Sequence, residues 1–281
     1  MAVLGDEQAS EIRRKLLSSG EFTLVHAFPQ KDSPARRVFR DAKLSTALFV
    51  YHKLPAGAVS AGHFSSHVHP AQFIEPNSST LSLDNNSIKL YDPENLTIVS
   101  CSQEDWDLMA SLPAAKISRF GEYVDFFQGE VNQTVATAEG LLTDKGNGPL
   151  VIRGANICLY QLRDASQGED IYLDVEGFLR GKDRTTKAYH HLLERIGLQE
   201  SSPQNNFRRL ISCRILKEHF CNHTINYTTE EHSKLPLELV LFVLNSAFAE
   251  WYFRLGSTNA HVSHYQLKNC HAHVSQFVPR I

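Results

Sequence analysis

Amide and hydroxyl side chains are concentrated in two short segments of this 281-residue sequence. The first is Gln128-Gly-Glu-Val-Asn-Gln-Thr134, and the second is Gln199-Glu-Ser-Ser-Pro-Gln-Asn-Asn-Phe-Arg-Arg209. Asn and Gln can pair bidentately with adenine, Arg with guanine, and Ser or backbone N–H groups with phosphate. Both segments also have the composition of ordinary turns. The residues alone therefore leave two interpretations open, a nucleic-acid contact and a structural turn.

Basic residues are concentrated around the second of these segments. Residues 180–217 contain nine Lys or Arg and three acidic residues, a net charge of +6, whereas the whole chain has a formal charge of −3. The rest of the chain therefore carries −9. A basic block inside an acidic chain is typical of a protein that binds a polyanion. A solvated basic face is the alternative interpretation.

Metal and nucleophile chemistry find little support in the sequence. Histidine and cysteine recur near the C-terminus and between residues 213 and 223 (Cys213, Cys221, His223, His261, His264, Cys270, His271 and His273). Their spacing matches no paired zinc-ligand pattern, and the chain contains no C-x-x-C. It also lacks a G-x-S-x-G elbow and a glycine-rich phosphate loop. We expect no metal site, and a zinc-dependent hydrolase built on the C-terminal histidines is the weakest functional hypothesis.

Composition places the chain among folded proteins. It is 42% hydrophobic and 21% charged, close to the globular average, and its length suggests roughly two domains. The five dispersed cysteines fit reduced thiols better than a disulfide framework. No signal segment is present, and the longest apolar stretch, 237–248, is shorter than the ~18 residues that a spanning helix needs. We therefore expect a cytoplasmic protein with no membrane partner.

Hydrophobic periodicity predicts a mixed α/β (α+β) fold. The spacing predicts a helix at 11–17, with Ile12 on its apolar side and Arg13 on its polar side, and strands at 22–28 and 44–54 that form the edge of a larger sheet. A helix capped by Ser102 and ended by Pro113 is also predicted. Later helices are predicted at 187–196 and 236–256. Further strands are predicted at 88–91, 96–99, 124–127, 150–152, 157–162, 171–173, 210–216 and 224–227.

Several motifs, taken together, resemble one protein family. They are Gly129-Glu-Val-Asn-Gln-Thr134, Pro149-Leu-Val-Ile-Arg-Gly-Ala-Asn-Ile157, Pro203-Gln-Asn-Asn-Phe-Arg-Arg209, Phe220-Cys-Asn-His-Thr-Ile-Asn226, and the stretch from Leu244-Asn-Ser246 to Ser257-Thr-Asn259. Their order over roughly residues 116–270 resembles the TaqI-like C-terminal specificity domain of N6-adenine DNA methyltransferases, including those of type IIG restriction–modification enzymes. Residues 12–53 resemble the last helix and strands of the methyltransferase domain that precedes it.

The resemblance implies three parts and a missing catalytic half. Residues 1–70 correspond to a C-terminal remnant of the catalytic domain, 71–115 to a linker with short strands and one helix, and 116–281 to the target-recognition domain. The family's glycine-rich S-adenosylmethionine loop and its Asn-Pro-Pro-Tyr/Phe motif do not occur in the chain. We therefore expect no cofactor and no catalytic residue here, with S-adenosylmethionine bound by the complete enzyme, and no activity from this chain alone.

The resemblance also implies which residues meet double-stranded DNA. The candidates for base contacts are Asn132, Gln133, Thr134, Gln204, Asn205 and Asn206. The candidates for phosphate contacts are Lys182, Arg184, Arg208, Arg209 and Arg254. The expected partners are DNA and the missing catalytic half, in cis or in trans. The main alternative is a protein-interaction subunit that assembles a split methyltransferase without reading bases.

Overall fold

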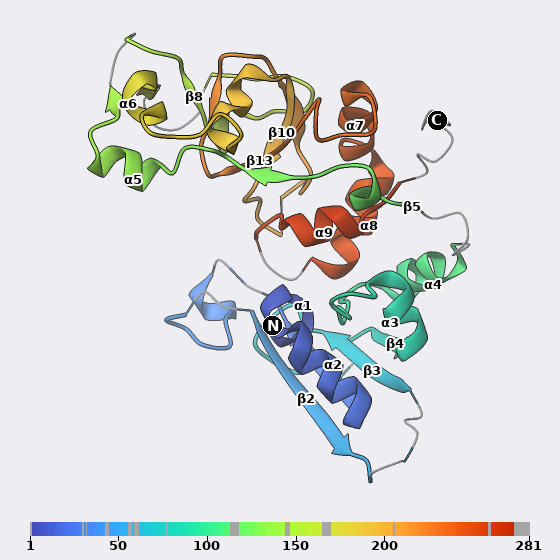
Figure 1. Ribbon diagram of the computed structural model, residues 1–281. Helices are drawn as coiled ribbons and strands as arrows, with labels where there is room; N and C mark the ends of the chain where they lie inside the picture. Colours follow the sequence, from blue (N-terminus) through green and yellow to red (C-terminus); the bar gives the residue numbers. More distant parts are fainter. Residues whose placement is uncertain are drawn as a thin grey trace. The chain divides into compact units, whose positions relative to one another are not determined.

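The computed structural model describes residues 2–29, 31, 33–42, 45–55, 58, 62–76, 78–112, 118–143, 147–164, 170–204, 206–257 and 260–272. The chain divides into two compact units (Figure 1). The first comprises Met1–Ile117 and Trp251–Ala260, and the second Ser118–Glu250 and His261–Ile281. Both units contain helices and sheets, which confirms the predicted mixed α/β class.

A four-stranded sheet is the centre of the first unit. Its strand order is β2-β1-β3-β4, formed by β1 (Gly20–Phe28), β2 (Thr46–Lys53), β3 (His63–Val68) and β4 (Thr80–Asp84). Strand β1 pairs antiparallel with β2 and parallel with β3, and β4 pairs antiparallel with β3. The two predicted strands are confirmed, but β3 and β4 arise from a Gly/Pro-rich stretch that gave no strand signal. The sheet therefore continues past residue 70, the predicted end of the catalytic-domain remnant.

Helix α2 (Ser10–Ser19) confirms the predicted N-terminal helix but not its buried face. The side chain of Arg13 is fully buried, whereas Ile12 is 55% exposed. Arg13 Nε donates to the carbonyl of Asn95 at 2.7 Å and Nη1 to that of Val3 at 3.2 Å. Because these hydrogen bonds offset the cost of burying the guanidinium, Arg13 can lie on the buried face of the helix. The predicted orientation of this helix was wrong.

Capping decides the other helices of this unit. The Oδ1 atom of Asp84, at the end of β4, accepts from the N–H groups of Asn86 and Ser87, both at 2.9 Å, and so begins helix α3 (Asn85–Tyr91) where a strand was predicted. Ser102 caps α4 (Gln103–Ser111) as predicted, since its Oγ accepts from Asp105 N at 3.1 Å. Residues 96–99 are buried without belonging to a named strand. The remaining elements are α1 (Ala2–Gly5) and the 3₁₀ turns η1 (Glu7–Ala9) and η2 (Pro34–Arg36).

The second unit is organised around an antiparallel sheet of order β11-β10-β13-β6. Its strands are β6 (Phe127–Gln128), β10 (Arg195–Gln199), β11 (Ser212–Ile215) and β13 (Ile225–Thr229). Three two-stranded pairings accompany it: β8 (Val151–Ile152) with β12 (Phe220–Cys221), β7 (Leu142–Thr143) with β9 (Tyr172–Leu173), and β5 (Ser118–Arg119) with β14 (His271–Ala272). Observed strands lie within the predicted strands 150–152, 171–173 and 210–216, β13 overlaps most of 224–227, and β6 overlaps 124–127 only at Phe127. The stretch 157–162 is instead a turn closed by a single bridge.

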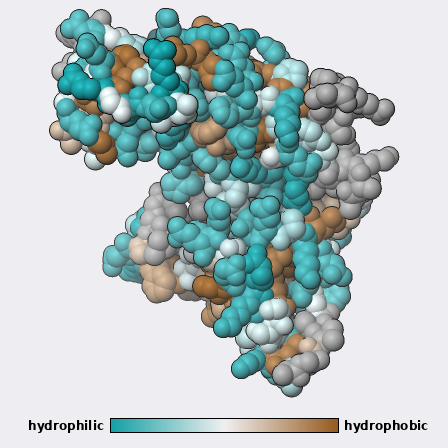
Figure 2. All heavy atoms as spheres, in the orientation of Figure 1, coloured by the Kyte–Doolittle hydropathy of each residue, from teal (hydrophilic) through white to brown (hydrophobic). Residues whose placement is uncertain are grey.

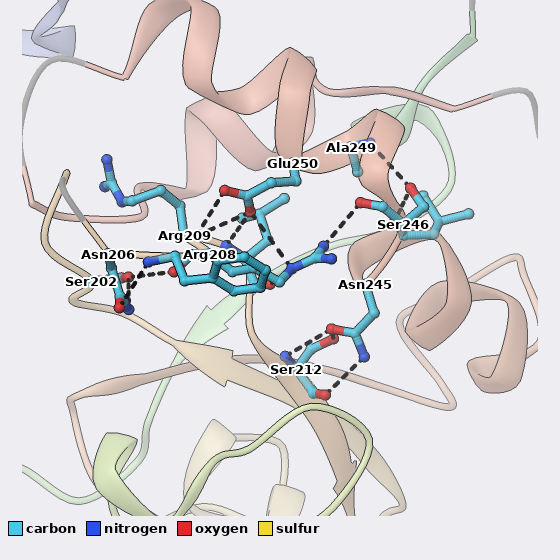
Figure 3. A network of polar contacts seen from close by, with 12 residues as sticks. Ser202, Asn206, Arg208, Arg209, Ser212, Asn245, Ser246, Ala249 and Glu250 are labelled. Carbon is cyan, nitrogen blue, oxygen red and sulfur yellow. Dashed lines mark hydrogen bonds and ion pairs between the residues drawn. The ribbon is translucent and has the colours of Figure 1, made fainter.

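Two predicted helices of this unit were wrong in different ways. Residues 187–196 form the 3₁₀ turn η6 (Lys187–Leu192) followed by strand β10, not one helix. The segment 236–256 is divided into α7 (Leu237–Leu244) and α8 (Ala247–Gly256). Between them, the side chain of Asn245 binds Ser212 by three hydrogen bonds of 2.9–3.1 Å, which fixes the interruption against β11 (Figure 3).

Short elements complete the unit. They are α5 (Gln133–Ala138), α6 (Val175–Leu179), α9 (His264–Asn269) and the 3₁₀ turns η4 (Phe120–Glu122) and η5 (Gly154–Asn156). One apolar cluster packs α5 and α6 around Val131, Phe178 and Phe220, and a second packs Cys213, Ile225 and Tyr227 beneath the sheet. Among the described residues no helix combines the length and the apolarity needed to cross a bilayer.

Candidate DNA interface

The strand pairing brings three polar segments to one end of the second unit's sheet. Leu198 pairs with Ser212, Gln199 with Ile225, and Asn226 with Gln128. Strands β10 and β6 therefore finish where β11 and β13 begin. The segments 128–134, 200–211 and 222–224 follow or precede these strand ends, and we call this region the loop end. Segments that are distant in sequence thus share one surface.

The first loop-end segment is built into a helix start. Asn132 Oδ1 accepts from the N–H groups of Thr134 at 3.1 Å and Val135 at 3.3 Å, which begins helix α5. Gln133 Oε1 accepts from Asn222 Nδ2 at 2.7 Å, which ties this segment to 222–224. Asn132 and Thr134 are exposed and Gln133 is half-buried. The capping oxygen of Asn132 therefore has a structural role, and the residue as a whole is exposed.

The second loop-end segment is held by its own hydrogen bonds (Figure 3). Asn206 Nδ2 donates to Ser202 Oγ at 3.2 Å, and Ser202 Oγ donates to the carbonyl of Arg208 at 3.1 Å. Asn206 is exposed and Gln204 is half-buried. Asn205, a further base-contact candidate, lies outside the described residues. Predicted base-contacting residues from two sequence regions therefore lie at the same end of the sheet.

Arg208 and Arg209 have a different role from the one expected. Arg209 is 1% exposed, and its Nη2 donates to the carbonyl of His261 at 3.3 Å. Arg208 Nη2 donates to the carbonyl of Ser246 at 3.0 Å, and its Nε lies 4.0 Å from a carboxylate oxygen of Glu250 (Figure 3). The Arg208 guanidinium therefore holds the 200–211 segment against the start of α8, and the Arg209 guanidinium holds it against His261. We do not retain them as phosphate contacts.

The rest of the basic block sorts into paired and exposed cations. Arg195 is buried against Glu130, Arg214 bonds Glu194 and Glu238, and Lys217 Nζ lies 3.2 Å from Glu230. Four exposed cations remain within eight residues: Arg180, Lys182, Arg184 and Lys187. We call residues 180–187 the basic segment. Lys182 and Arg184 were predicted as phosphate contacts from the sequence. Arg180 and Lys187 were not, although the close spacing of the four cations could have indicated them.

The basic segment is attached to the loop end. Lys187 Nζ donates to the backbone carbonyls of Gln128 at 2.9 Å and Gly129 at 3.3 Å. Lys182 Nζ donates to the carbonyl of Phe178 and lies 3.5 Å from the centre of that ring. Lys187 therefore attaches one end of the basic segment to the 128–134 segment. The last phosphate candidate, Arg254, is half-buried on α8 and belongs to the first unit, so nothing associates it with this surface.

Cysteine and histidine side chains form no reactive centre among the described residues. Burial raises the pKa of Cys101, Cys213 and Cys270 to about 12, and it also raises the pKa of Cys221. Such thiols stay protonated at neutral pH and are poor nucleophiles. No group of three or more His, Cys, Asp or Glu side chains is arranged to hold a metal ion in this part of the chain. His273, one of the zinc-ligand candidates, lies outside it.

A buried ion pair supports the loop end from below. Arg195 Nη1 lies 2.9 Å from Glu130 Oε1, and both side chains are fully buried. Glu130 Oε1 also accepts from Cys221 N at 3.0 Å, while Arg195 donates to the carbonyl of His219. These contacts join the 128–134 segment to β10 and β12. Because a buried charge without a partner is costly, the pair fixes the position of the first loop-end segment.

His190 adds a pH-sensitive contact to the same core. Its Nδ1 lies 3.1 Å from the Tyr227 hydroxyl, and burial, followed by His232, Arg195 and Lys187, lowers its pKa to about 4. An unfolded His titrates near 6.5. Between pH 6.5 and 4 the unfolded chain therefore binds a proton that the folded chain does not, and stability falls as the pH falls.

We expect His190→Gln to remove this dependence. The stability advantage of the wild type over this variant should shrink by about 2–3 kcal/mol between pH 7 and pH 4. Urea denaturation at both pH values measures it. The same substitution at the half-buried His219, outside this cluster, controls for the loss of an imidazole. A wild-type advantage that does not change with pH would contradict the burial of a neutral His190.

Comparisons with known proteins give only distant structural likenesses. No family model and no curated protein matches the chain. Among solved structures, it resembles the type IIL restriction–modification enzyme MmeI in complex with DNA, with 12% identity and a TM-score of 0.46 over 93% of this chain. It also resembles the type IIG restriction endonuclease BpuSI, with 9% identity and a TM-score of 0.38 over 96% of this chain. The matches span 36% and 39% of those chains. At these values the likeness carries no conclusion about function.

Proposed function

We propose that the second unit is the DNA-recognition module of a restriction–modification enzyme that methylates adenine at N6. The observation that carries the proposal is that exposed amide side chains of the loop end, Asn132 and Asn206, occur together with the exposed cations of the basic segment, which Lys187 attaches to the loop end. Amides read base edges, and cations bind phosphate and make the binding salt-dependent. Loops that carry both kinds of group and follow the ends of a sheet are suited to docking in a major groove.

The proposal assigns separate roles to the two sets of residues. Base edges would be read by Asn132, Gln133, Thr134, Gln204 and Asn206, together with Asn205 outside the described residues. Phosphates would be bound by Lys182 and Arg184, as the sequence indicated, and also by Arg180 and Lys187. Lys187 Nζ also donates hydrogen bonds to the carbonyls of Gln128 and Gly129. It therefore positions the basic segment as well as contributing charge.

Methyl transfer would require a partner half. The chain has neither the glycine-rich loop nor the Asn-Pro-Pro motif, so its residues do not fit S-adenosylmethionine, and no step of catalysis is assigned to them. The first unit offers a surface for such a partner. Strand β2 is at the edge of its sheet, and Leu48 and Val50 on it are each 50% exposed. Figure 2 shows apolar residues at the surface of this unit. An exposed apolar edge strand is suited to pairing with another chain or domain.

The same edge supports a second candidate, a protein-interaction subunit that assembles a split methyltransferase without reading bases. A fluorescence-anisotropy titration of a labelled random-sequence duplex tests whether the chain binds DNA at all. The proposal predicts binding at 50 mM salt with a dissociation constant of about 10⁻⁶ M or lower, weakening steeply as salt increases. Absence of binding at tens of micromolar chain would overturn the proposal and favour the interaction subunit.

A further inference from the structure

Phe207 is the most exposed large hydrophobic residue in the described part of the chain. Its side chain is 91% exposed, compared with 68% for Phe73, the next in rank. Isolated exposed hydrophobic residues are common on protein surfaces. Phe207 differs because it lies at the loop end, inside the 200–211 segment that carries Gln204 and Asn206.

The backbone on both sides of Phe207 is fixed. On one side, Asn206 N donates to the carbonyl of Pro203 at 3.0 Å, and the Asn206 side chain bonds Ser202. On the other side, the N–H groups of Arg209 and Leu210 donate to the carboxylate of Glu250 at 2.8–3.0 Å, in the buried start of α8 (Figure 3). The ring is therefore presented to solvent by a braced segment. A group that is already ordered loses less entropy when it binds.

A second exposed ring lies at the same end of the sheet. Tyr160 N donates to the carbonyl of Ser212 at 2.9 Å, at the first residue of β11, and its side chain is also exposed. Its φ of +66° is in the left-handed region, which is uncommon for an aromatic residue. Amide side chains and two exposed aromatic rings thus occur at the same end of the sheet, to which Lys187 attaches the basic segment. Aromatic rings among basic and amide side chains are the combination that binds unstacked nucleobases.

We propose that Phe207 stacks on a nucleobase of the bound DNA. The inference rests on the proposed function, and it assigns to Phe207 a contribution to affinity that does not depend on salt. Every nucleobase has a π face on which the ring can stack, so this contact tolerates changes of DNA sequence, unlike the amide contacts beside it. Phe207 is therefore an affinity residue, and the neighbouring amides determine which bases are preferred.

The test compares duplex binding by the full-length chain and four variants. Phe207→Ala and Phe207→Leu should both bind roughly 5- to 150-fold more weakly, because both lose the aromatic face. Phe207→Tyr should bind like the wild type. The slope of log affinity against log salt should be unchanged in all of them, since no phosphate contact is lost. Phe242→Ala is the matched control, because it removes another exposed phenylalanine, 64% exposed on α7.

The outcomes separate the inference from the function on which it rests. If the wild type binds no duplex, the proposed function fails. If the wild type binds and Phe207→Ala binds equally well, only the stacking role is overturned. Wild-type affinity of Phe207→Leu, or a changed salt slope, would also overturn it, because an apolar wedge or a phosphate effect would then explain the binding. Circular dichroism checks that each variant is folded.

Discussion

Replacing Glu130 by glutamine should lower the free energy of unfolding of the second unit by about 3–5 kcal/mol. The substitution keeps the shape of the side chain but leaves the Arg195 guanidinium buried without its carboxylate, whose oxygen lies 2.9 Å away in the wild type. Urea denaturation of the full-length chain, followed by far-UV circular dichroism, measures the change. Glu231→Gln, at an exposed turn, is the matched control and should change stability by less than about 0.5 kcal/mol.

A double variant tests whether charge is the cause. Glu130→Leu combined with Arg195→Met removes both charges together and should be closer to wild-type stability than either single change. A loss below about 1 kcal/mol for Glu130→Gln would contradict the account of this pair. It would mean that the 128–134 segment is positioned by its other contacts, such as the hydrogen bond from Asn222 to Gln133.

Removing three charges from the basic segment should weaken duplex binding by roughly 10²-fold at 0.1 M salt. The variant is Arg180→Gln, Lys182→Gln and Arg184→Gln, and it leaves Lys187 in place because Lys187 also bonds the 128–134 segment. If each cation meets one phosphate, the slope of log affinity against log salt should become shallower by about 2.7, or 0.9 for each contact. Anisotropy titrations between 50 and 300 mM salt measure both quantities.

The control removes the same number of charges from the opposite end of the sheet. Lys217, Lys234 and Lys268 are exposed cations of the second unit that lie near the finish of β11 and β13 or the start of β6. Their triple change to Gln should alter the slope by less than one. Equal slopes for the two triple variants would contradict a localised phosphate contact. The binding would then depend on net charge alone.

Sequence patterns predicted the class of fold and many of its strands, but not the details that depend on tertiary contacts. Buried strands such as β1 and β11 have strong apolar runs and were recognised. Helix α2 was oriented wrongly because Arg13 finds carbonyl partners 82 and 10 residues away, which no local pattern encodes. The first two residues of β10 were assigned to the helix predicted at 187–196, most of which is the 3₁₀ turn η6 that comes before the strand.

Residue types in the sequence indicated exposed polar side chains but not the contacts that each of them makes. Asn132, Thr134 and Asn206 are exposed where the sequence analysis expected contacts, because polar turn residues tend to stay at the surface. Arg208 and Arg209 were selected for their charge, yet their guanidinium groups bond the carbonyls of Ser246 and His261, which lie 38 and 52 residues further along the chain. The three loop-end segments lie at one end of the sheet because of the register of β10, which was not predicted as a strand.

Selection from a pool of random duplexes tests the central claim most directly. The full-length chain is incubated with the pool, bound DNA is recovered and amplified, and the enriched sequences are read after several rounds. The account predicts a short enriched motif that contains adenine, and a motif altered at one or two positions for the variant Gln204→Ala with Asn206→Ala. Recovery of sequences without any common motif, although DNA is bound, would contradict base recognition by the loop end.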